Sequence, residues 1–349
     1  MMKAWVLHGV NDLRYEEVAK PAPAEDEVLI KVRAVGICGS DIPRIYENGT
    51  YSFPTIPGHE FAGEVVQCGE KVSEEWMGKR VGVFPLIPCR ECGPCRKNQF
   101  EMCRHYSYIG SRQDGAFGEY VVAPAVNLVE LSEKVSFEEA AMLEPMAVAV
   151  HAMRRVQPTA EDVVVVCGVG TIGLMLLMFL QEVGVKKLLV VGNKDFQKEQ
   201  VLKLGIPAEH YCDTRSCDAD AWIQEQTGKW GADVFFECVG RNETIARAVR
   251  NAAPAGRVMM VGNPFTDMTF ERDTYWKILR NQLWVTGTWN STFTGEENDD
   301  WHCVLKCLEE GRIAPKELIS HRFVLEDLER GFHIMRDKSE DYVKVMAVL

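Results

Sequence analysis

The chain has 349 residues, of which 46% are hydrophobic and 26% charged, and its formal net charge is −12. This composition excludes a disordered or collagen-like chain, and the length is that of about two domains. The excess of acidic residues argues against nucleic acids and membrane surfaces as partners, because phosphate-rich surfaces bind clustered positive charge.

The chain shows neither a signal peptide nor an apolar run of about 18 residues, so we expect a cytoplasmic protein that does not cross a membrane. Its 12 cysteines also indicate a reducing compartment. Thiols that cluster under those conditions are metal ligands or reactive groups more often than disulfides.

The first 150 residues are typical of β-structure. Short Val-rich runs bounded by glycine, proline and acidic residues predict strands at Lys3–Leu7, Glu27–Val35 and Glu60–Cys68. Prolines punctuate the segment 50–103, so we expect loops there and a stabiliser other than a large hydrophobic core.

After about residue 150, short apolar runs alternate with helical patterns. We expect strands at Asp162–Cys167, Lys187–Val191, Asp233–Glu237 and Arg257–Val261, and helices at Thr171–Val183, Phe196–Leu204 and Glu243–Ala252. This alternation predicts βαβ units and a parallel sheet. From about Val285 the pattern is mixed again, with a helix expected at Trp301–Glu310.

A glycine-rich motif follows the first of these strands. Gly168-Val169-Gly170-Thr171-Ile172-Gly173 matches G-x-G-x-x-G and opens a predicted helix, which is the context that a dinucleotide-binding turn requires. We expect a tight turn at Gly168, close approach of the pyrophosphate at Gly170, and close helix–strand packing at Gly173.

The cofactor preference is predicted from the end of the next strand, where an acidic residue normally holds the adenine-side ribose. Here the sequence is Gly192-Asn193-Lys194. Gly192 replaces the carboxylate that would repel a 2′-phosphate, and Lys194 supplies a cation. This favours NADP over NAD, although Asn193 can still bind an unphosphorylated ribose and Asp195 follows directly.

Four cysteines with close spacing indicate a closed zinc site. Cys89, Cys92, Cys95 and Cys103 follow the pattern C-x2-C-x2-C-x7-C, which can enclose a tetrahedral Zn²⁺. An iron–sulfur cluster is the competing interpretation, but its usual bacterial spacing has three residues before the last cysteine and a proline after it.

A second metal site is suggested by residues from three separate segments. Cys38, His59 and Glu144, with Glu60 beside His59, offer a thiolate, an imidazole and carboxylates. Three such ligands leave one coordination position open, as in a catalytic zinc site. Spacing alone does not decide between this site and three unrelated residues.

On these residues the chain resembles the zinc-dependent medium-chain dehydrogenases, the family of the alcohol and sorbitol dehydrogenases. Gly58-His59-Glu60, the cysteine lobe and the turn Gly168–Gly173 follow one another in that family's order, and the likeness extends to Lys344-Val345. Within the family, Cys38–Gly49 and Pro85–Tyr120 are most similar to galactitol-1-phosphate 5-dehydrogenases and related polyol dehydrogenases.

The resemblance implies an α/β protein with a GroES-like, β-rich catalytic domain formed by residues 1–148 and 286–349, including a structural-zinc lobe at about 85–110. Residues 149–285 would form a Rossmann domain with a doubly wound parallel sheet. It also implies a catalytic zinc at Cys38, His59 and Glu144, with Glu60 as a nearby or alternative ligand. The structural zinc would be held by the four clustered cysteines.

The implied activity is hydride transfer between a secondary alcohol of a polyol or polyol phosphate, such as galactitol 1-phosphate, and NAD or NADP, giving the ketose. Glu60 and Ser40 are the expected catalytic residues. Many family members carry a relay histidine where this chain has Pro43, which leaves Ser40 to pass the proton. The pair Pro43-Arg44 also occurs in the galactitol-phosphate enzymes.

A phosphorylated substrate requires a cation, for which Arg44 and Arg112 are the candidates, and Trp289 is a candidate for the pocket wall. The family usually forms homodimers or homotetramers, and Gln282–Thr288 is a candidate edge strand for self-pairing. The open alternatives are a zinc-dependent alcohol or sorbitol-type dehydrogenase for an unphosphorylated substrate, a zinc-free quinone-reductase relative, and a non-enzymatic nucleotide sensor.

Overall fold

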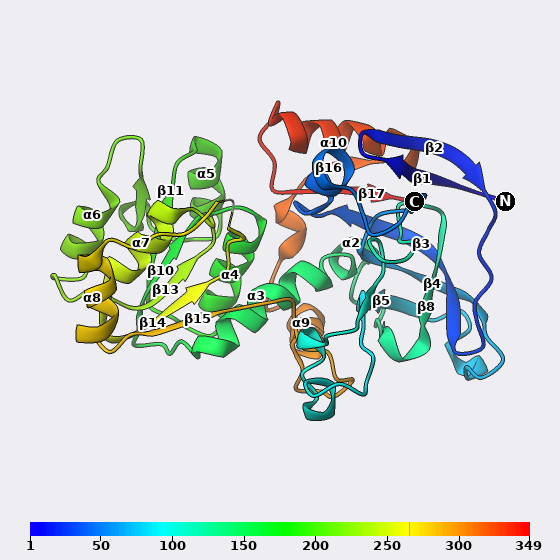
Figure 1. Cartoon of the computed structure of the whole chain (residues 1–349), viewed down its shortest axis with the longest axis horizontal. Coiled ribbons are helices and arrows are strands. Elements are labelled where there is room, and N and C mark those ends of the chain that lie inside the picture. The colour runs from blue at the N-terminus through cyan, green and yellow to red at the C-terminus, as the bar shows by residue number, and fades with distance from the viewer. Residues whose placement is uncertain (265) are drawn as a thin grey trace. The chain divides into compact units, whose positions relative to one another are not determined.

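The computed structural model describes residues 1–264 and 266–349, which fall into two compact units (Figure 1). The first unit contains residues 1–147 and 291–349, and the second contains residues 148–290. The second boundary therefore lies at 290, where the sequence predicted 285. Both units combine helices with sheets, which confirms the predicted α/β class.

The first unit is mainly β-structure. Its strands are β1 (Met2–Gly9), β2 (Asp12–Val18), β3 (Glu27–Ile37), β4 (Glu60–Cys68), β5 (Arg80–Val83), β6 (Leu86–Ile87), β7 (Ser107–Tyr108), β8 (Tyr120–Pro124), β9 (Leu128–Glu130), β16 (Ile319–Phe323) and β17 (Lys344–Val348). A seven-stranded sheet has the order β16-β17-β3-β4-β5-β9, with β8 paired to β3. The strands predicted in the first 70 residues are confirmed, and β3 extends two residues further than expected.

Few helices belong to this unit, and most are short. They are α1 (Asp41–Pro43), α2 (Phe137–Ala140), α9 (Asp300–Glu309) and α10 (Leu328–Asp337), the π-helical turn η1 (Arg44–Asn48), and the 3₁₀ turns η2 (Glu74–Trp76), η3 (Cys95–Lys97), η4 (Phe100–Met102), η5 (Ala125–Asn127), η7 (Pro315–Leu318) and η8 (Leu325–Asp327). Helix α3 (Leu143–Val156) begins in the first unit and continues into the second. The helix predicted at the start of the C-terminal segment is α9.

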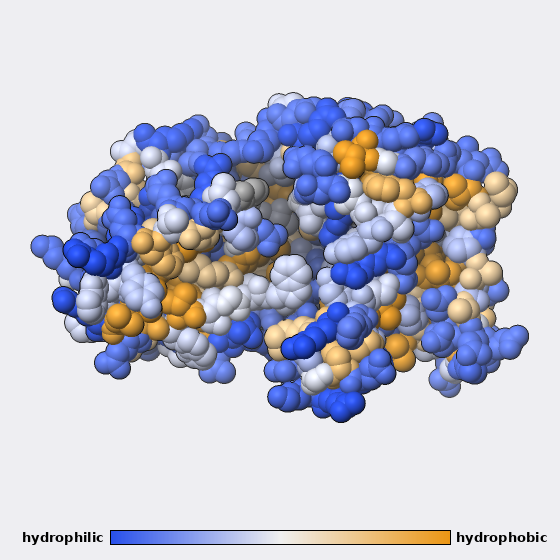
Figure 2. All heavy atoms as spheres, viewed as in Figure 1, coloured by the Kyte–Doolittle hydropathy of each residue, from blue (hydrophilic) through white to orange (hydrophobic). Residues whose placement is uncertain are grey.

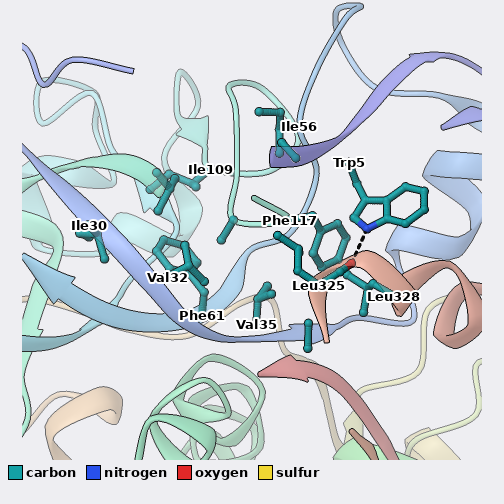
Figure 3. Packing of buried hydrophobic residues seen from close by; sticks show 14 of the residues in the cluster. Trp5, Ile30, Val32, Val35, Ile56, Phe61, Ile109, Phe117, Leu325 and Leu328 are labelled. Atoms are coloured by element: carbon teal, nitrogen blue, oxygen red, sulfur yellow. Dashed lines mark hydrogen bonds between the residues drawn. The ribbon is translucent and has the colours of Figure 1, made fainter. Parts of the chain in front are cut away.

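The hydrophobic core of the first unit joins its two chain segments. Trp5 donates a hydrogen bond of 2.7 Å from its indole nitrogen to the carbonyl oxygen of Leu325 (Figure 3). Phe332 on α10 is fully buried, and its ring centroid lies 5.2 Å from that of Phe117. Strand β17 pairs antiparallel with β3. The C-terminal segment is therefore an integral part of the first unit's core.

The second unit is a parallel sheet with connecting helices. Its strands are β10 (Val163–Cys167), β11 (Lys187–Gly192), β12 (Tyr211–Asp213), β13 (Ala232–Glu237), β14 (Ala252–Met260) and β15 (Trp284–Gly287), and its helical segments are α4 (Thr171–Glu182), α5 (Asp195–Lys203), η6 (Ala208–His210), α6 (Ala219–Gln226), α7 (Asn242–Arg250) and α8 (Arg272–Arg280). The strand order is β12-β11-β10-β13-β14-β15, and every neighbouring pair is parallel. The predicted βαβ pattern is confirmed.

Two sequence predictions in this unit differ from the structure. The helix expected at Glu243–Ala252 ends at Arg250, because Ala252 already pairs with Ala232 in the sheet. Strand β14 therefore begins five residues before the expected Arg257 and ends at Met260. Pairing partners that are distant in sequence override the helical preference of the alanines here.

No helix within residues 1–264 and 266–349 has both the length and the apolar character needed to cross a membrane. On the face drawn in Figure 2, hydrophilic residues predominate and hydrophobic residues form smaller patches among them.

The packing of α10 predicts the effect of shortening its buried aromatic residue. We expect Phe332→Ala to lower the free energy of unfolding of the first unit by about 3–5 kcal/mol, because the variant loses buried surface and leaves a cavity. Chemical denaturation followed by tryptophan fluorescence measures this. Val324→Ala, at a position 59% exposed in the same segment, should change it by less than about 0.5 kcal/mol. Equal losses in both variants would contradict the packing described here.

Candidate functional site

The four clustered cysteines converge in the loop-rich segment of the first unit. Their sulfur atoms all lie within 4.8 Å of one another. The Sγ atoms of Cys92 and Cys95 are 3.5 Å apart, and Cys92 and Cys103 are 3.9 Å apart. A tetrahedral Zn²⁺ with Zn–S bonds of about 2.3 Å places its sulfurs roughly 3.8 Å apart. The cluster therefore has the dimensions of a closed zinc site.

Backbone groups around this cluster favour the anionic form of sulfur. The amide of Cys89 donates to the Sγ of Cys103 over 3.2 Å, and the amide of His105 donates to the same sulfur over 3.4 Å. Backbone hydrogen bonds near Arg104 and Cys95 lower the pKa of Cys92 to about 6. Burial and neighbouring thiols raise the pKa of Cys95 to about 12. Four thiolates this close together would repel one another, and a cation among them would offset that repulsion.

A second group of potential ligands forms where β3 ends and β4 begins. Gly36 on β3 pairs with Glu60 on β4, so Cys38, just after β3, lies beside His59 and Glu60. Ligand atoms of these three residues lie within 4.8 Å of one another. The structure thus brings together side chains that are 22 positions apart in the chain.

Asp41 is a member of this site that the sequence interpretation missed. It is fully buried and accepts a hydrogen bond of 3.0 Å from the amide of Cys38. Its Oδ1 lies 3.4 Å from Nδ1 of His59 and 3.2 Å from the guanidinium of Arg44. Its position three residues after Cys38, on the turn entering α1, was the available signal. Asp41 thus places a carboxylate beside the imidazole and pairs with Arg44.

The electrostatics at His59 indicate a place for a cation. Burial would lower the pKa of His59, but the negative charges of Asp41 and Cys38 raise it to about 10. The Nδ1 atom is nevertheless buried without a hydrogen-bond partner among the described residues, although Oδ1 of Asp41 lies 3.4 Å away. A positive charge beside the ring is thus favoured, whether it is carried by a proton or by a metal.

Glu60 is held by a buried lysine. The ammonium of Lys344 on β17 donates to a carboxylate oxygen of Glu60 and to the carbonyl of Ile37, the latter over 3.0 Å. Burial lowers the pKa of Lys344 to about 8. A Cβ at Gly36 would lie 2.6 Å from this carboxylate, so only glycine leaves room for the pair. Lys344 thereby connects the C-terminal strand to the site.

Glu144, at the start of α3, lies in the same surroundings but outside the tight group of three ligands. Its Oε1 accepts a hydrogen bond of 3.2 Å from the hydroxyl of Tyr108. Burial raises the pKa of Glu144, and the charge of His59 opposes this. The ring of Tyr108 packs edge-on against His59 with centroids 5.6 Å apart. No motif in the sequence pointed to Tyr108.

The ionisable groups around His59 include more potential anions than cations. The potential anions are the thiolate of Cys38 and the carboxylates of Asp41, Glu60 and Glu144, and the cations are Arg44 and Lys344. With a neutral imidazole, four negative charges therefore face two positive ones. A divalent cation would balance this buried group, and thiolate, imidazole and carboxylate are ligands that zinc accepts.

Ser40 and Arg44 lie at the edge of the same site. The hydroxyl of Ser40 donates to the Sγ of Cys38 over 3.2 Å. The guanidinium of Arg44 is paired with Asp41, and its side chain keeps 26% of its surface exposed. Ser40 is thus next to a potential metal ligand, and Arg44 is already partly neutralised.

Arg112 lies in an aromatic setting. Its guanidinium carbon is 4.0 Å from the ring centroid of Tyr51 and 4.3 Å from that of Tyr106. Its Nε is buried and has no hydrogen-bond partner among the described residues. Tyr106 in turn packs against Tyr108, with centroids 6.3 Å apart. Tyrosine rings therefore connect Arg112 to the surroundings of His59.

The glycine motif forms the turn between β10 and α4. Gly168 has φ of +97°, and a Cβ there would lie 2.5 Å from the side chain of Val239. Gly170 faces open space, as close approach of a ligand requires. A Cβ at Gly173 would lie 2.0 Å from the carbonyl oxygen of Gly168 and 3.8 Å from the side chain of Val166 on β10, so this position is close to both the turn and the strand. Thr171 and Ile172 begin the helix, with its amide groups towards the turn.

The packing of Tyr211 explains why the residue at the end of β11 is a glycine, Gly192. A Cβ at Gly192 would lie 2.3 Å from the hydroxyl of Tyr211, which donates to the carbonyl of Lys194 over 3.3 Å. An acidic side chain at 192 would require Tyr211 to move. Asn193 and Lys194 follow with exposed side chains. Trp289, the candidate for the pocket wall, is 58% exposed.

Comparison with known proteins places these features in a family. Two family models match the chain: the alcohol dehydrogenase GroES-like domain over residues 24–133 and the zinc-binding dehydrogenase over residues 171–310. The galactitol 1-phosphate 5-dehydrogenase of Escherichia coli K12 is 31% identical over 317 residues, covering 90% of this chain and 91% of that protein.

Solved structures agree over the whole length. The crystal structure of galactitol-1-phosphate dehydrogenase from Escherichia coli has a TM-score of 0.92 and 28% identity, and the match covers 100% of both chains. A putative zinc-binding dehydrogenase from Sinorhizobium meliloti 1021, bound to NADP, also has a TM-score of 0.92, with 27% identity and coverage of 100% and 99%. The chain therefore belongs to the zinc-dependent medium-chain dehydrogenases, with a GroES-like domain and a Rossmann domain that uses NAD or NADP.

Proposed function

We propose that the chain interconverts a secondary alcohol of a polyol or polyol phosphate and the corresponding ketose, with NADP as the favoured cofactor. The observation that carries this is the buried group of Cys38, His59 and Glu60, whose surrounding charges call for a divalent cation. A bound zinc would act as a Lewis acid on the substrate oxygen, while the nicotinamide exchanges hydride with the carbon.

The protein's own groups have distinct tasks in this proposal. Cys38 and His59 bind the metal with a carboxylate from Glu144 or Glu60. Ser40, next to Cys38, relays the hydroxyl proton: it accepts that proton as it releases its own toward solvent or a ribose hydroxyl of the cofactor. Pro43 stands where other family members have a relay histidine. Lys344 keeps the Glu60 carboxylate in place when Glu144 is the ligand.

A phosphorylated substrate is supported by Arg112. Its buried Nε has no partner among the described residues, and its guanidinium is stacked between tyrosine rings. A guanidinium prepared in this way suits bidentate binding of phosphate. Arg44 is the weaker candidate because Asp41 already accepts its hydrogen bond. The phosphate of a compound such as galactitol 1-phosphate would bind at Arg112.

We further propose a cofactor preference, a residue of the pocket wall, a location and a mode of self-association. NADP is favoured by Gly192-Asn193-Lys194, with no carboxylate at 192 and a cation at 194. Trp289 would line the substrate pocket. A cytoplasmic location would fit the 12 cysteines, which form no disulfide among the described residues. Strand β15, at the edge of its sheet, would pair with a second copy to form a homodimer, alone or within a homotetramer.

Metal analysis tests the two zinc sites. We expect about two zinc ions per purified chain and about one in both Cys38→Ser and Cys103→Ser. Only Cys103→Ser should also lower the melting temperature markedly, because the loop-rich segment relies on its metal. Cys217→Ser, outside both clusters, should retain both ions. An unchanged zinc content in either ligand variant would refute the corresponding site.

A substrate panel tests the reaction. We expect reduction of NADP⁺ with galactitol 1-phosphate at a higher kcat/KM than with galactitol or sorbitol. Arg112→Gln should lower this phosphate preference at least about tenfold, as expected for loss of a charge-assisted pair. Arg104→Gln, at an exposed arginine of the same segment, is the matched control.

The panel also separates the alternatives. Equal use of galactitol and its phosphate would assign the chain to the dehydrogenases of unphosphorylated polyols. Cofactor binding without turnover of any polyol in the panel would favour the nucleotide-sensor alternative.

Sedimentation velocity tests self-association through β15. Trp284 on this strand is 58% exposed, and a glutamate there would place charge in the proposed interface. We expect Trp284→Glu to reduce the sedimenting mass by a factor of about two. Trp230→Glu, at a residue 64% exposed outside the sheet, should leave the mass unchanged. A wild-type protein that sediments as a monomer would disprove the interface.

A further inference from the structure

A charged cluster lies where the second and third strands of the parallel sheet end. Gly192 at the end of β11 pairs with Asp213 at the end of β12, and the amide of Thr214 donates to the carbonyl of Gly192 over 2.9 Å. In a Rossmann fold the adenine-side ribose binds beyond the end of the second strand. The residues that follow β12 therefore lie next to the ribose position, although they are more than 40 positions after the glycine turn.

Arg215 spans the space between the two strand ends. Its Nε lies 2.9 Å from Oδ1 of Asp213, and its Nη2 lies 2.5 Å from Oδ2 of the same carboxylate. The same Nη2 lies 2.5 Å from Oδ1 of Asp195, and Nη1 lies 3.3 Å from Oδ2. Asp195 is the first residue of α5, directly after Lys194. One guanidinium thus bridges carboxylates from two separate βα connections.

Arg215 is the cation that pairs directly with both carboxylates of this cluster. Lys194, Lys198 and Arg215 are positive, and Asp195 and Asp213 are negative, but among the described residues Arg215 alone forms ion pairs with Asp195 and Asp213. Hydrogen bonds from Arg215 lower the pKa of Asp213 to about 2, so this carboxylate is ionised at neutral pH. Without Arg215 these two carboxylates would lose their direct ion-pair partner, and Lys198 would act on them only at longer range. Carboxylates without a paired cation disfavour a phosphate and suit the free ribose hydroxyls of NAD.

The guanidinium remains accessible to a ligand. The side chain of Arg215 is 49% exposed, and that of Asp195 is 82% exposed, so their ion pair is largely solvated. A solvated ion pair is worth little, and one carboxylate partner can be exchanged for a phosphate at small cost. Asp213, with 19% of its side chain exposed, would keep the arginine in position during the exchange.

We propose that Arg215 is the residue that admits the 2′-phosphate of NADP, by neutralising Asp195 and Asp213 and exchanging the Asp195 carboxylate for the phosphate. The proposal rests on the proposed use of a nicotinamide cofactor at the glycine turn. It adds a determinant from the third strand to the residues at the end of the second. Among the described residues, neither Lys194 nor Lys198 forms an ion pair with these carboxylates, so Arg215 is the cation that holds them.

Equilibrium binding to the full chain tests the proposal without turnover. Isothermal titration with NADP⁺, NAD⁺ and 2′,5′-ADP gives three dissociation constants for each variant. For Arg215→Ala we expect the ratio Kd(NADP⁺)/Kd(NAD⁺) to rise at least fivefold, with a parallel loss of 2′,5′-ADP binding. For Asp195→Asn, which removes one of the competing carboxylates, we expect the ratio to fall. Opposite shifts are not expected from general damage to the fold.

The matched control is Lys186→Ala. Lys186 forms an exposed ion pair with Glu161, at the other end of the same strands, and its loss should leave the ratio unchanged. A rise of less than fivefold for Arg215→Ala, or a fall for Asp195→Asn that is matched by Lys186→Ala, would overturn the proposal. The wild-type ratio separately shows which cofactor is preferred, so a preference for NAD would refute the proposed cofactor without deciding the role of Arg215.

Discussion

The need to balance buried charge governs the first unit. Carboxylates and a thiol converge on His59 in a place where solvent is excluded, and unpaired charges there would cost several kcal/mol each. The positive charges that offset these groups come from distant segments: Arg44 lies on η1 and Lys344 on the last strand. A divalent cation bound by Cys38, His59 and Glu60 would supply the rest. The C-terminal segment belongs to this unit for an electrostatic reason as well as for its packing.

In both units, sheet pairing positions the residues that could bind a metal or a cofactor. In each, the potential ligands follow the ends of neighbouring strands, so the register of the sheet determines which side chains meet. The pairing of Gly36 with Glu60 brings Cys38 to His59, and the pairing of Gly192 with Asp213 brings Arg215 to Asp195. Gly36 and Gly192 stand at positions where a Cβ would lie less than 3.0 Å from a neighbouring side chain. The residues with potential functional roles therefore follow the strand ends, and the pairing of the strands fixes their positions.

The sequence was sufficient where function depends on local spacing. The cysteine lobe and the turn from Gly168 to Gly173 each lie within one short segment, and both have the geometry that their spacing predicts. Asp41 and Tyr108 were not found, because an acidic residue on a turn and a tyrosine in a loop are common everywhere. Their roles depend on contacts with His59 and Glu144, which come from other segments.

The sequence by itself determined the α/β class, the succession of strands and helices after residue 150, the cysteine cluster and the family resemblance, because periodicity and spacing are local properties. Only the tertiary structure decided that Glu60 is bound by Lys344, that Tyr211 excludes a side chain at Gly192, and that Arg215 bridges Asp195 and Asp213. Each of these depends on strand order and register. Those are set by the burial of side chains from distant parts of the chain, which no short segment encodes alone.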